Sequence, residues 1–173
     1  MEPFPITPRQ FAWLWLAVLA VTVGSAAAFR RAQRLPFFRP KFPDAEVQQN
    51  WRSGASSLGL MGSLGRVKSC LWFVLTRDTL HVGVHFPFNM FMPRFIFGLD
   101  LTIPVGAISS VSVSEKTAFS GDDHVRVEYE LTDTTRGVVR TEFLDLWPRR
   151  GDQFFEILRK KAAGAGPAAR VRR

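Results

Sequence analysis

The chain has 173 residues, of which 46% are apolar and 22% are charged, a composition typical of a chain that folds around a core. This length allows one domain of ordinary size with appendages, so a multidomain enzyme is not expected. With a single cysteine, the chain cannot form a disulfide framework or a cysteine-based zinc or iron–sulfur site. The formal net charge is +8.

The excess positive charge lies outside the central part of the sequence. Residues 44–161 contain 14 basic and 14 acidic side chains, whereas residues 30–43 carry five basic residues and no acid, and residues 162–173 add three arginines. A nucleic-acid-binding domain is expected to carry a basic face. Because the central part is neutral, we expect no nucleic-acid binding.

Residues 11–29, which follow a short flank at 1–10, predict a membrane-spanning helix. The stretch FAWLWLAVLAVTVGSAAAF contains no charged residue and no proline. As a helix it would be about 28 Å long, close to the hydrocarbon thickness of a bilayer. Trp13 and Trp15 near one end and Phe29 at the other suit the interfacial zones of a membrane.

A cleaved signal peptide is the alternative interpretation of this apolar run, since the alanines at 26–28 would suit a cleavage site. The flank before the run has three prolines and no net side-chain charge, and arginines follow the run at once, which favours a retained anchor. One arginine precedes the run and five basic residues follow it, so the positive-inside rule predicts an outside N-terminus. The domain would then lie on the cytoplasmic side of a bacterial-type inner membrane. The single cysteine, Cys70, agrees with a reducing compartment.

Residues 30–49 are predicted to form a basic, proline-rich juxtamembrane linker. Its segment LPFFRPKFP (35–43) has three prolines in nine positions, which favours an extended chain. Basic side chains next to a membrane helix would lie against anionic headgroups. The predicted headgroup contacts are Arg30, Arg31, Arg34, Arg39 and Lys41.

A pattern with a period of two, from Val67 onward, predicts antiparallel strands rather than helices. In one of these strands, apolar side chains alternate with charged ones from Val125 to Leu131, so one face is expected to be buried. The expected strands are 67–76, 79–86, 99–104, 108–115, 124–131 and 137–146.

One helix is expected to follow the strands, beginning near Gly151. Phe154, Ile157 and Leu158 would form its apolar face, and Asp152 would either cap it or interact favourably with its N-terminal dipole. Residues 162–173 are predicted to be a disordered basic tail, because GAGPAA disfavours further helix.

Several phrases resemble the pattern of bacterial PH-like and GRAM-like domains. They are LTRDTLHV (75–82), LTIPVGAISSVSV (101–113) and GDQFFEILRK (151–160). The segments WRSG (51–54) and FPFNMFMP (86–93) are similar to stretches in small membrane-anchored bacterial proteins of unassigned function. The resemblance implies a mainly β (α+β) fold over residues 50–161, a PH-like barrel of six to seven antiparallel strands with a C-terminal capping helix, preceded by one transmembrane helix. A lipocalin-like barrel and an OB-fold are the alternatives, although neither needs the closing helix.

The region corresponding to the inositol-phosphate site of eukaryotic PH domains is GLMGSLGRVKS (59–69). It offers Arg66 and Lys68, with Arg52 upstream, but not the dense cationic cluster that phosphate capture needs. We therefore expect no specific phosphoinositide binding, while nonspecific contact with anionic lipid stays open.

The most unusual segment is FPFNMFMPRFIFG (86–98), with five phenylalanines, two methionines and one isoleucine in 13 positions. Its prolines oppose both a regular strand and a helix. One interpretation is a lid folded onto the core; another is a hairpin that dips into the membrane or binds a protein partner, and self-association is a third. The predicted contact residues of such a hairpin are Phe88, Met90, Phe91, Met92, Arg94 and Phe95.

No pattern predicts catalysis, a cofactor or a metal site. His81 and His85 share a strand face but would lie about 13 Å apart, too far to bind one metal. Cys70 is interpreted as a small buried hydrophobe. The sequence thus predicts a noncatalytic membrane-anchored interaction module that binds lipid or a protein partner. The alternatives are a periplasmic or secreted β-barrel-like domain that binds a small apolar ligand after signal cleavage, and an accessory subunit of a membrane complex.

Overall fold

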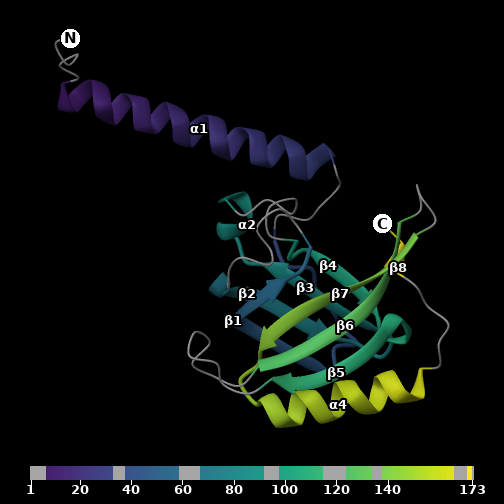
Figure 1. The fold of residues 1–173 in the computed structure, drawn as a ribbon. Helices are drawn as coiled ribbons and strands as arrows, with labels where there is room; N and C mark the ends of the chain where they lie inside the picture. The colour runs from purple at the N-terminus through teal and green to yellow at the C-terminus, as the bar shows by residue number, and fades with distance from the viewer. Residues whose placement is uncertain are drawn as a thin grey trace.

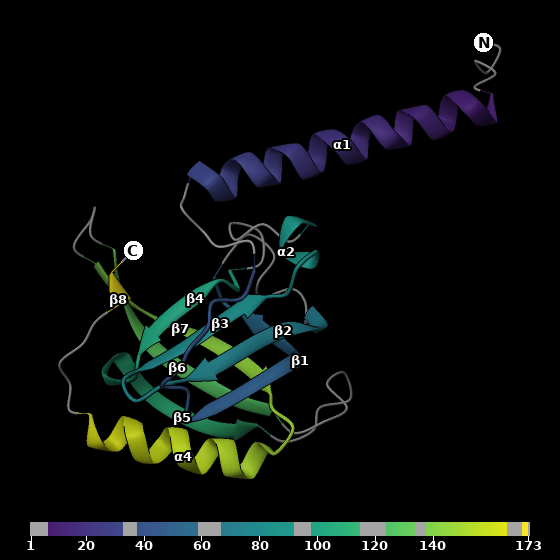
Figure 2. The same ribbon diagram turned by 180° about the vertical axis from the view of Figure 1, so that it is seen from behind.

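The structure, a computed structural model, describes residues 7–32, 38–58, 67–91, 98–114, 124–133, 138–165 and 171–172. It comprises a long N-terminal helix, a curved β-sheet and a C-terminal helix (Figures 1 and 2). In chain order the elements are α1 (Pro8–Ala32), β1 (Val47–Ser56), β2 (Val67–Leu75), β3 (Thr79–Val84), α2 (Phe88–Phe91), β4 (Leu101–Pro104), the 3-10 helix η2 (Val105–Ala107), β5 (Ile108–Ser114), β6 (His124–Asp133), β7 (Val138–Trp147), α4 (Gly151–Gly164) and β8 (Val171–Arg172).

The helix α1 begins with a well-formed N-terminal cap. The Gln10 backbone N–H donates to Thr7 Oγ1 at 3.3 Å, and the Thr7 backbone N–H donates to Gln10 Oε1 at 2.9 Å. Pro8 occupies the first helical position, where its missing N–H costs nothing. The helix is long and apolar enough to cross a membrane, and none of its most apolar stretch is buried against the rest of the structure. It is therefore a candidate transmembrane or signal helix.

Seven antiparallel strands form the sheet in the order β4-β3-β2-β1-β7-β6-β5. The two outer strands, β4 and β5, are joined directly by the three-residue η2, so the sheet curls round on itself. The helix α4 lies at one end of the curled sheet, and α1 lies at the opposite end (Figures 1 and 2). This arrangement confirms the predicted mainly β architecture with one helix at each end of the chain.

The predicted alternation in β6 is confirmed by burial. Val127 and Tyr129 are fully buried, whereas Arg126 and Glu128 between them are partly exposed. The helix α4 covers the core from one end: Phe154 is buried, and its ring centroid lies 5.1 Å from that of Phe73 in β2. Asp152 lies in the first turn of α4, where it interacts favourably with the helix dipole, and among the described residues no side chain makes a capping hydrogen bond to this helix.

The strand β1 was not predicted, because its sequence VQQNWRSGAS does not alternate. It nevertheless lies at the centre of the sheet, between β2 and β7. Irregular register on both sides of Arg52 interrupts its pairing with β2, and Trp51 there adopts a positive φ of 56°. Its first residue, Val47, falls within the predicted linker 30–49.

The C-terminal tail contains a short strand that the sequence does not predict. Residues 171–172 form β8, which pairs in parallel with β6 at Leu131 and Thr132. Residues 166–170 and 173 of the predicted disordered tail lie outside the described residues.

Candidate functional site

A buried ion pair connects α1 to the sheet domain. Arg30, in the last turns of α1, is only 5% exposed, and its Nη1 lies 3.0 Å from Asp100 Oδ2. Val23, Ala26 and Ala27 are partly buried on the same helix face, since they precede Arg30 by seven, four and three positions. The short helix α2 also contacts α1 (Figure 2). The C-terminal third of α1 is therefore held against the domain.

The five predicted headgroup contacts lie in different environments. Arg30 is buried in its ion pair with Asp100 and is thereby withdrawn from solvent. Arg31 and Lys41 are exposed and Arg39 is partly buried, whereas Arg34 lies outside the described residues.

Arg39 is held on the domain by two contacts. Its Nη1 donates to Asn50 Oδ1 at 2.5 Å, and its guanidinium lies 5.8 Å from the centre of the Trp72 ring. Burial lowers the pKa of Arg39 from its ordinary value, although a guanidinium remains charged. The positive charge of Arg39 is thus fixed next to β1 and β2.

Exposed aromatic side chains gather next to this junction. Phe38 is 70% exposed and Phe86 is 47% exposed, and their ring centroids lie 5.2 Å apart. Trp51 is 55% exposed and stacks on His85 with centroids 4.3 Å apart. Phe88, two residues after Phe86, is also exposed. We call Phe38, Trp51, Phe86 and Phe88 the aromatic patch.

The segment 86–98 contains a helical turn where none was predicted. Residues 88–91 form α2, in which Asn89 is buried and Phe88 is exposed. The side chains of Met90 and Phe91 lie outside the described part of the chain, as do Met92, Arg94 and Phe95.

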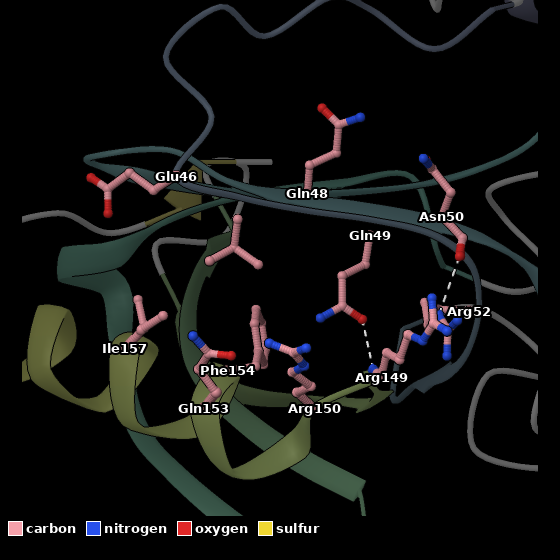
Figure 3. Close-up of a pocket in the computed structure, with 11 residues that line it drawn as sticks. Glu46, Gln48, Gln49, Asn50, Arg52, Arg149, Arg150, Gln153, Phe154 and Ile157 are labelled. Carbon is pink, nitrogen blue, oxygen red and sulfur yellow. Dashed lines mark hydrogen bonds between the residues drawn. The ribbon is translucent and has the colours of Figure 1, made fainter.

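A polar groove of about 780 Å³ lies between the first half of β1 and the start of α4 (Figure 3). Residues 46–50 and Arg52 line one wall, and Arg149, Arg150 and Gln153 line the other, with Phe154 and Ile157. The sequence does not predict this groove, because β1 is not recognisable as a strand. In addition, Arg52 on one wall of the groove lies about 100 positions before Arg149 and Arg150 on the other wall.

Two hydrogen bonds across the groove join its walls. The Arg149 backbone N–H donates to Gln49 Oε1 at 2.7 Å. Lys161 Nζ donates to Glu46 Oε1 at 2.7 Å near the opposite end. Figure 3 places Glu46 at one end and Arg52 with Arg149 at the other. At one end of the groove Glu46 is therefore already paired with Lys161, and the other end, with Arg52 and Arg149, is positively charged.

A structural ion pair joins β6 to β7 through Arg126 and Asp145. Arg126 forms two hydrogen bonds to Asp145, both 2.8 Å, and these bonds raise the pKa of Arg126. Cys70 is buried, and burial raises the pKa of its thiol, so it is a poor nucleophile. Among the described residues, no three His, Cys, Asp or Glu side chains come together as a metal site.

In comparisons with known proteins, no family model matches this chain, and no curated protein matches it. The class of protein is thus defined by the structure alone. It is a mainly β domain of seven antiparallel strands with a C-terminal helix, attached to an N-terminal helix of transmembrane or signal type.

Proposed function

We propose that this protein is a noncatalytic interaction module, in which a single transmembrane helix holds a PH-like domain at the cytoplasmic surface of a bacterial-type inner membrane. The seven-strand order and the closing helix α4 support a PH-like fold, together with the phrases of sequence that resemble such domains. The excess of basic residues after α1 supports the N-out orientation.

The observation that carries this proposal is the attachment of α1 to the domain next to the aromatic patch. Large apolar side chains of α1 are exposed along most of its length, which is unfavourable in water and favourable in a bilayer. When α1 spans a membrane, its C-terminal end lies at the interface, and the patch lies close to the same level. Aromatic rings are favoured at this level, and the exposed Arg31 and Lys41 would meet anionic headgroups.

The packing of α1 also supports a retained anchor rather than a cleaved signal. Cleavage near residue 28 would remove Val23, Ala26 and Ala27, which are partly buried on the helix face that includes Arg30. A signal helix that is to be discarded has no need for such a face.

Intact mass of the membrane-extracted protein, combined with protease accessibility of a C-terminal tag in spheroplasts, tests the anchor and its orientation. An uncleaved mass with a protected tag supports the proposal. A mass that lacks about the first 28 residues, with an accessible tag, contradicts it and places the domain in the periplasm.

A second experiment tests the position of the aromatic patch. An environment-sensitive NBD fluorophore is attached at Phe38→Cys in a Cys70→Ala background of the full chain in lipid nanodiscs. We expect blue-shifted emission and quenching by spin-labelled lipid. The matched control is Glu156→Cys on α4, whose side chain is 67% exposed at the opposite end of the domain. Equal emission from both positions would show that the patch does not contact the membrane.

A further inference from the structure

We infer that the groove between β1 and α4 binds an extended, acidic peptide segment of a partner protein. This inference rests on the proposed function in one respect only, namely that the α4 wall of the groove, at the end of the sheet opposite α1, is open to the cytoplasm. It names the kind of partner that the module would recruit.

One half of β1 lacks a neighbour on the groove side. Residues 47–49 pair with β2, and residues 53–56 pair with β7 on the other side of β1. The strand β7 ends at Trp147, opposite Ser53, and the chain then turns into α4. Among the strands that the structure describes, none pairs with residues 47–50 on the β7 side. The backbone oxygen of Asn50 accepts from Arg52 Nε at 3.2 Å, so the open part of the edge is residues 47–49. A strand edge left open in this way can accept an added strand from another chain.

The groove has the size and the walls for such a strand. Five residues, 46–50, line its β1 wall and span about 16 Å at the rise of an extended chain. The opposite wall presents the partly buried Ile157 and the Phe154 ring, and Gln153 offers an amide group, whereas Gln49 Oε1 already accepts from the Arg149 N–H. An extended segment of about five residues with alternating side chains matches this lining.

The charges at one end of the groove define the partner as acidic. Arg149 and Arg150 are exposed, and Arg52 is partly exposed on the facing wall. Guanidinium groups bind carboxylates through paired hydrogen bonds. The acid of the groove, Glu46, is already bonded to Lys161 at 2.7 Å. The cationic end is therefore complementary to a carboxylate-bearing ligand.

The position of the groove favours a protein over the membrane as the source of this ligand. The groove lies against α4, and α4 and α1 lie at opposite ends of the sheet (Figures 1 and 2). The sheet separates the α4 wall of the groove from α1, whereas the β1 wall reaches the aromatic patch, because Trp51 lies between Asn50 and Arg52. A cytoplasmic peptide can reach the groove from solution.

The test uses the full chain in nanodiscs of phosphatidylcholine, which carries no net charge. The probe is a fluorescein-labelled peptide of alternating glutamate and valine, and its lysine counterpart is the comparison. The variant is Arg149→Gln/Arg150→Gln, and the matched control is Arg159→Gln/Lys160→Gln, which removes the same charge from exposed positions of α4. Fluorescence polarisation gives the dissociation constants.

We expect saturable binding of the glutamate peptide, weakened about tenfold by the variant and by less than about twofold by the control. Absence of binding below about 1 mM, equal binding of the lysine peptide, or equal weakening by both double variants would overturn the inference. If the variant instead reduces binding to phosphatidylglycerol vesicles and leaves peptide binding unchanged, the groove is a lipid site and the inference also fails. The anchor is tested separately by intact mass, so its failure is distinguishable.

Discussion

Arg30 and Asp100 form an ion pair with a 3.0 Å contact between side chains that are 5% and 13% exposed, although 70 positions separate them in the chain. A charge withdrawn from water needs a partner, so this pair fixes the end of α1 on the segment that precedes β4. This electrostatic contact, together with the contact between α1 and α2, orients the domain relative to α1.

Asp100→Asn is expected to destabilise the protein strongly. It leaves the buried Arg30 guanidinium without its carboxylate, and breaking a buried pair from one side costs about 3 kcal/mol in the free energy of unfolding. The double variant Arg30→Met/Asp100→Asn should recover part of this loss, because no charge is then left buried. Urea unfolding of the full chain in detergent micelles measures both effects.

The neighbouring Arg31 provides the control for this prediction. Arg31 is exposed, so Arg31→Met should change the free energy of unfolding by less than about 0.5 kcal/mol. A loss for Asp100→Asn no larger than that for Arg31→Met would show that the ion pair does not hold α1.

Gly98→Ala is expected to disrupt the approach of two loops. Gly98 has a φ of +62°, and a Cβ atom there would lie 2.2 Å from the backbone oxygen of Leu58. Because backbone cannot move as easily as the end of a side chain, we expect a loss of about 3 kcal/mol or failure to fold. Gly164→Ala in α4, where a Cβ meets nothing within 4 Å, is the control and should leave stability equal or slightly higher. Similar melting temperatures for the two variants would contradict the close approach of Gly98 to the backbone of Leu58.

The strands β2 to β7 and the helix α4 could be predicted from local sequence. The strand β6 and the helix follow a simple period, whereas β2 is rich in strand-favouring residues and is buried throughout from Cys70 to Leu75. Alternation buries one face of a strand, and Phe154 and Leu158 share a face of α4. The strand β1 could not be predicted, because an irregular register and the positive φ of Trp51 replace alternation there. Such features depend on neighbouring strands and leave no periodic signal in the sequence.

The ion pair of Arg30, the groove and the aromatic patch were predictable only in part, because each brings together residues that are distant in the sequence. The sequence shows Arg30 as one of five basic residues after an apolar run, and only the fold brings it to Asp100. The groove arises where an unpredicted strand meets the turn at Arg149 and Arg150. The aromatic character of the segment after β3 was evident from the sequence, whereas the contributions of Phe38 and Trp51 to the same surface were not.

Cys70 should be protected from alkylation while the protein is folded. Its side chain is 1% exposed, and burial raises the pKa of the thiol, which lowers the fraction of reactive thiolate. At pH 8 we expect iodoacetamide to react at least on the order of 100-fold more slowly with the folded chain than with the chain in denaturant. Mass spectrometry after timed quenching measures the rates. Equal rates would show that β2 is not buried as described.

Stability is expected to fall as the pH is lowered from 7 to 5, in part through His85. Burial, and secondarily the charge of Arg39, lower the pKa of His85 below its ordinary value. Protonation therefore occurs more readily in the unfolded chain, whose histidine pKa is about 6.5. The stabilisation is complete above that pH and is lost as the pH falls through it towards the lower pKa of the folded state. His85→Phe retains a ring against Trp51 and removes this titration, so the variant should lose less stability on acidification.

His81 provides the comparison for this effect, because burial also lowers its pKa while Asp44 partly opposes the shift. His81→Phe should therefore reduce the pH dependence as well, and the double variant with His85→Phe should reduce it further. Melting temperatures of the four proteins at pH 7 and pH 5, measured in the same nanodiscs, separate these contributions from those of the carboxylates, which all four share. An unchanged pH dependence in His85→Phe would mean that His85 titrates equally in the folded and unfolded states, and that its stacking on Trp51 does not exclude water from the ring.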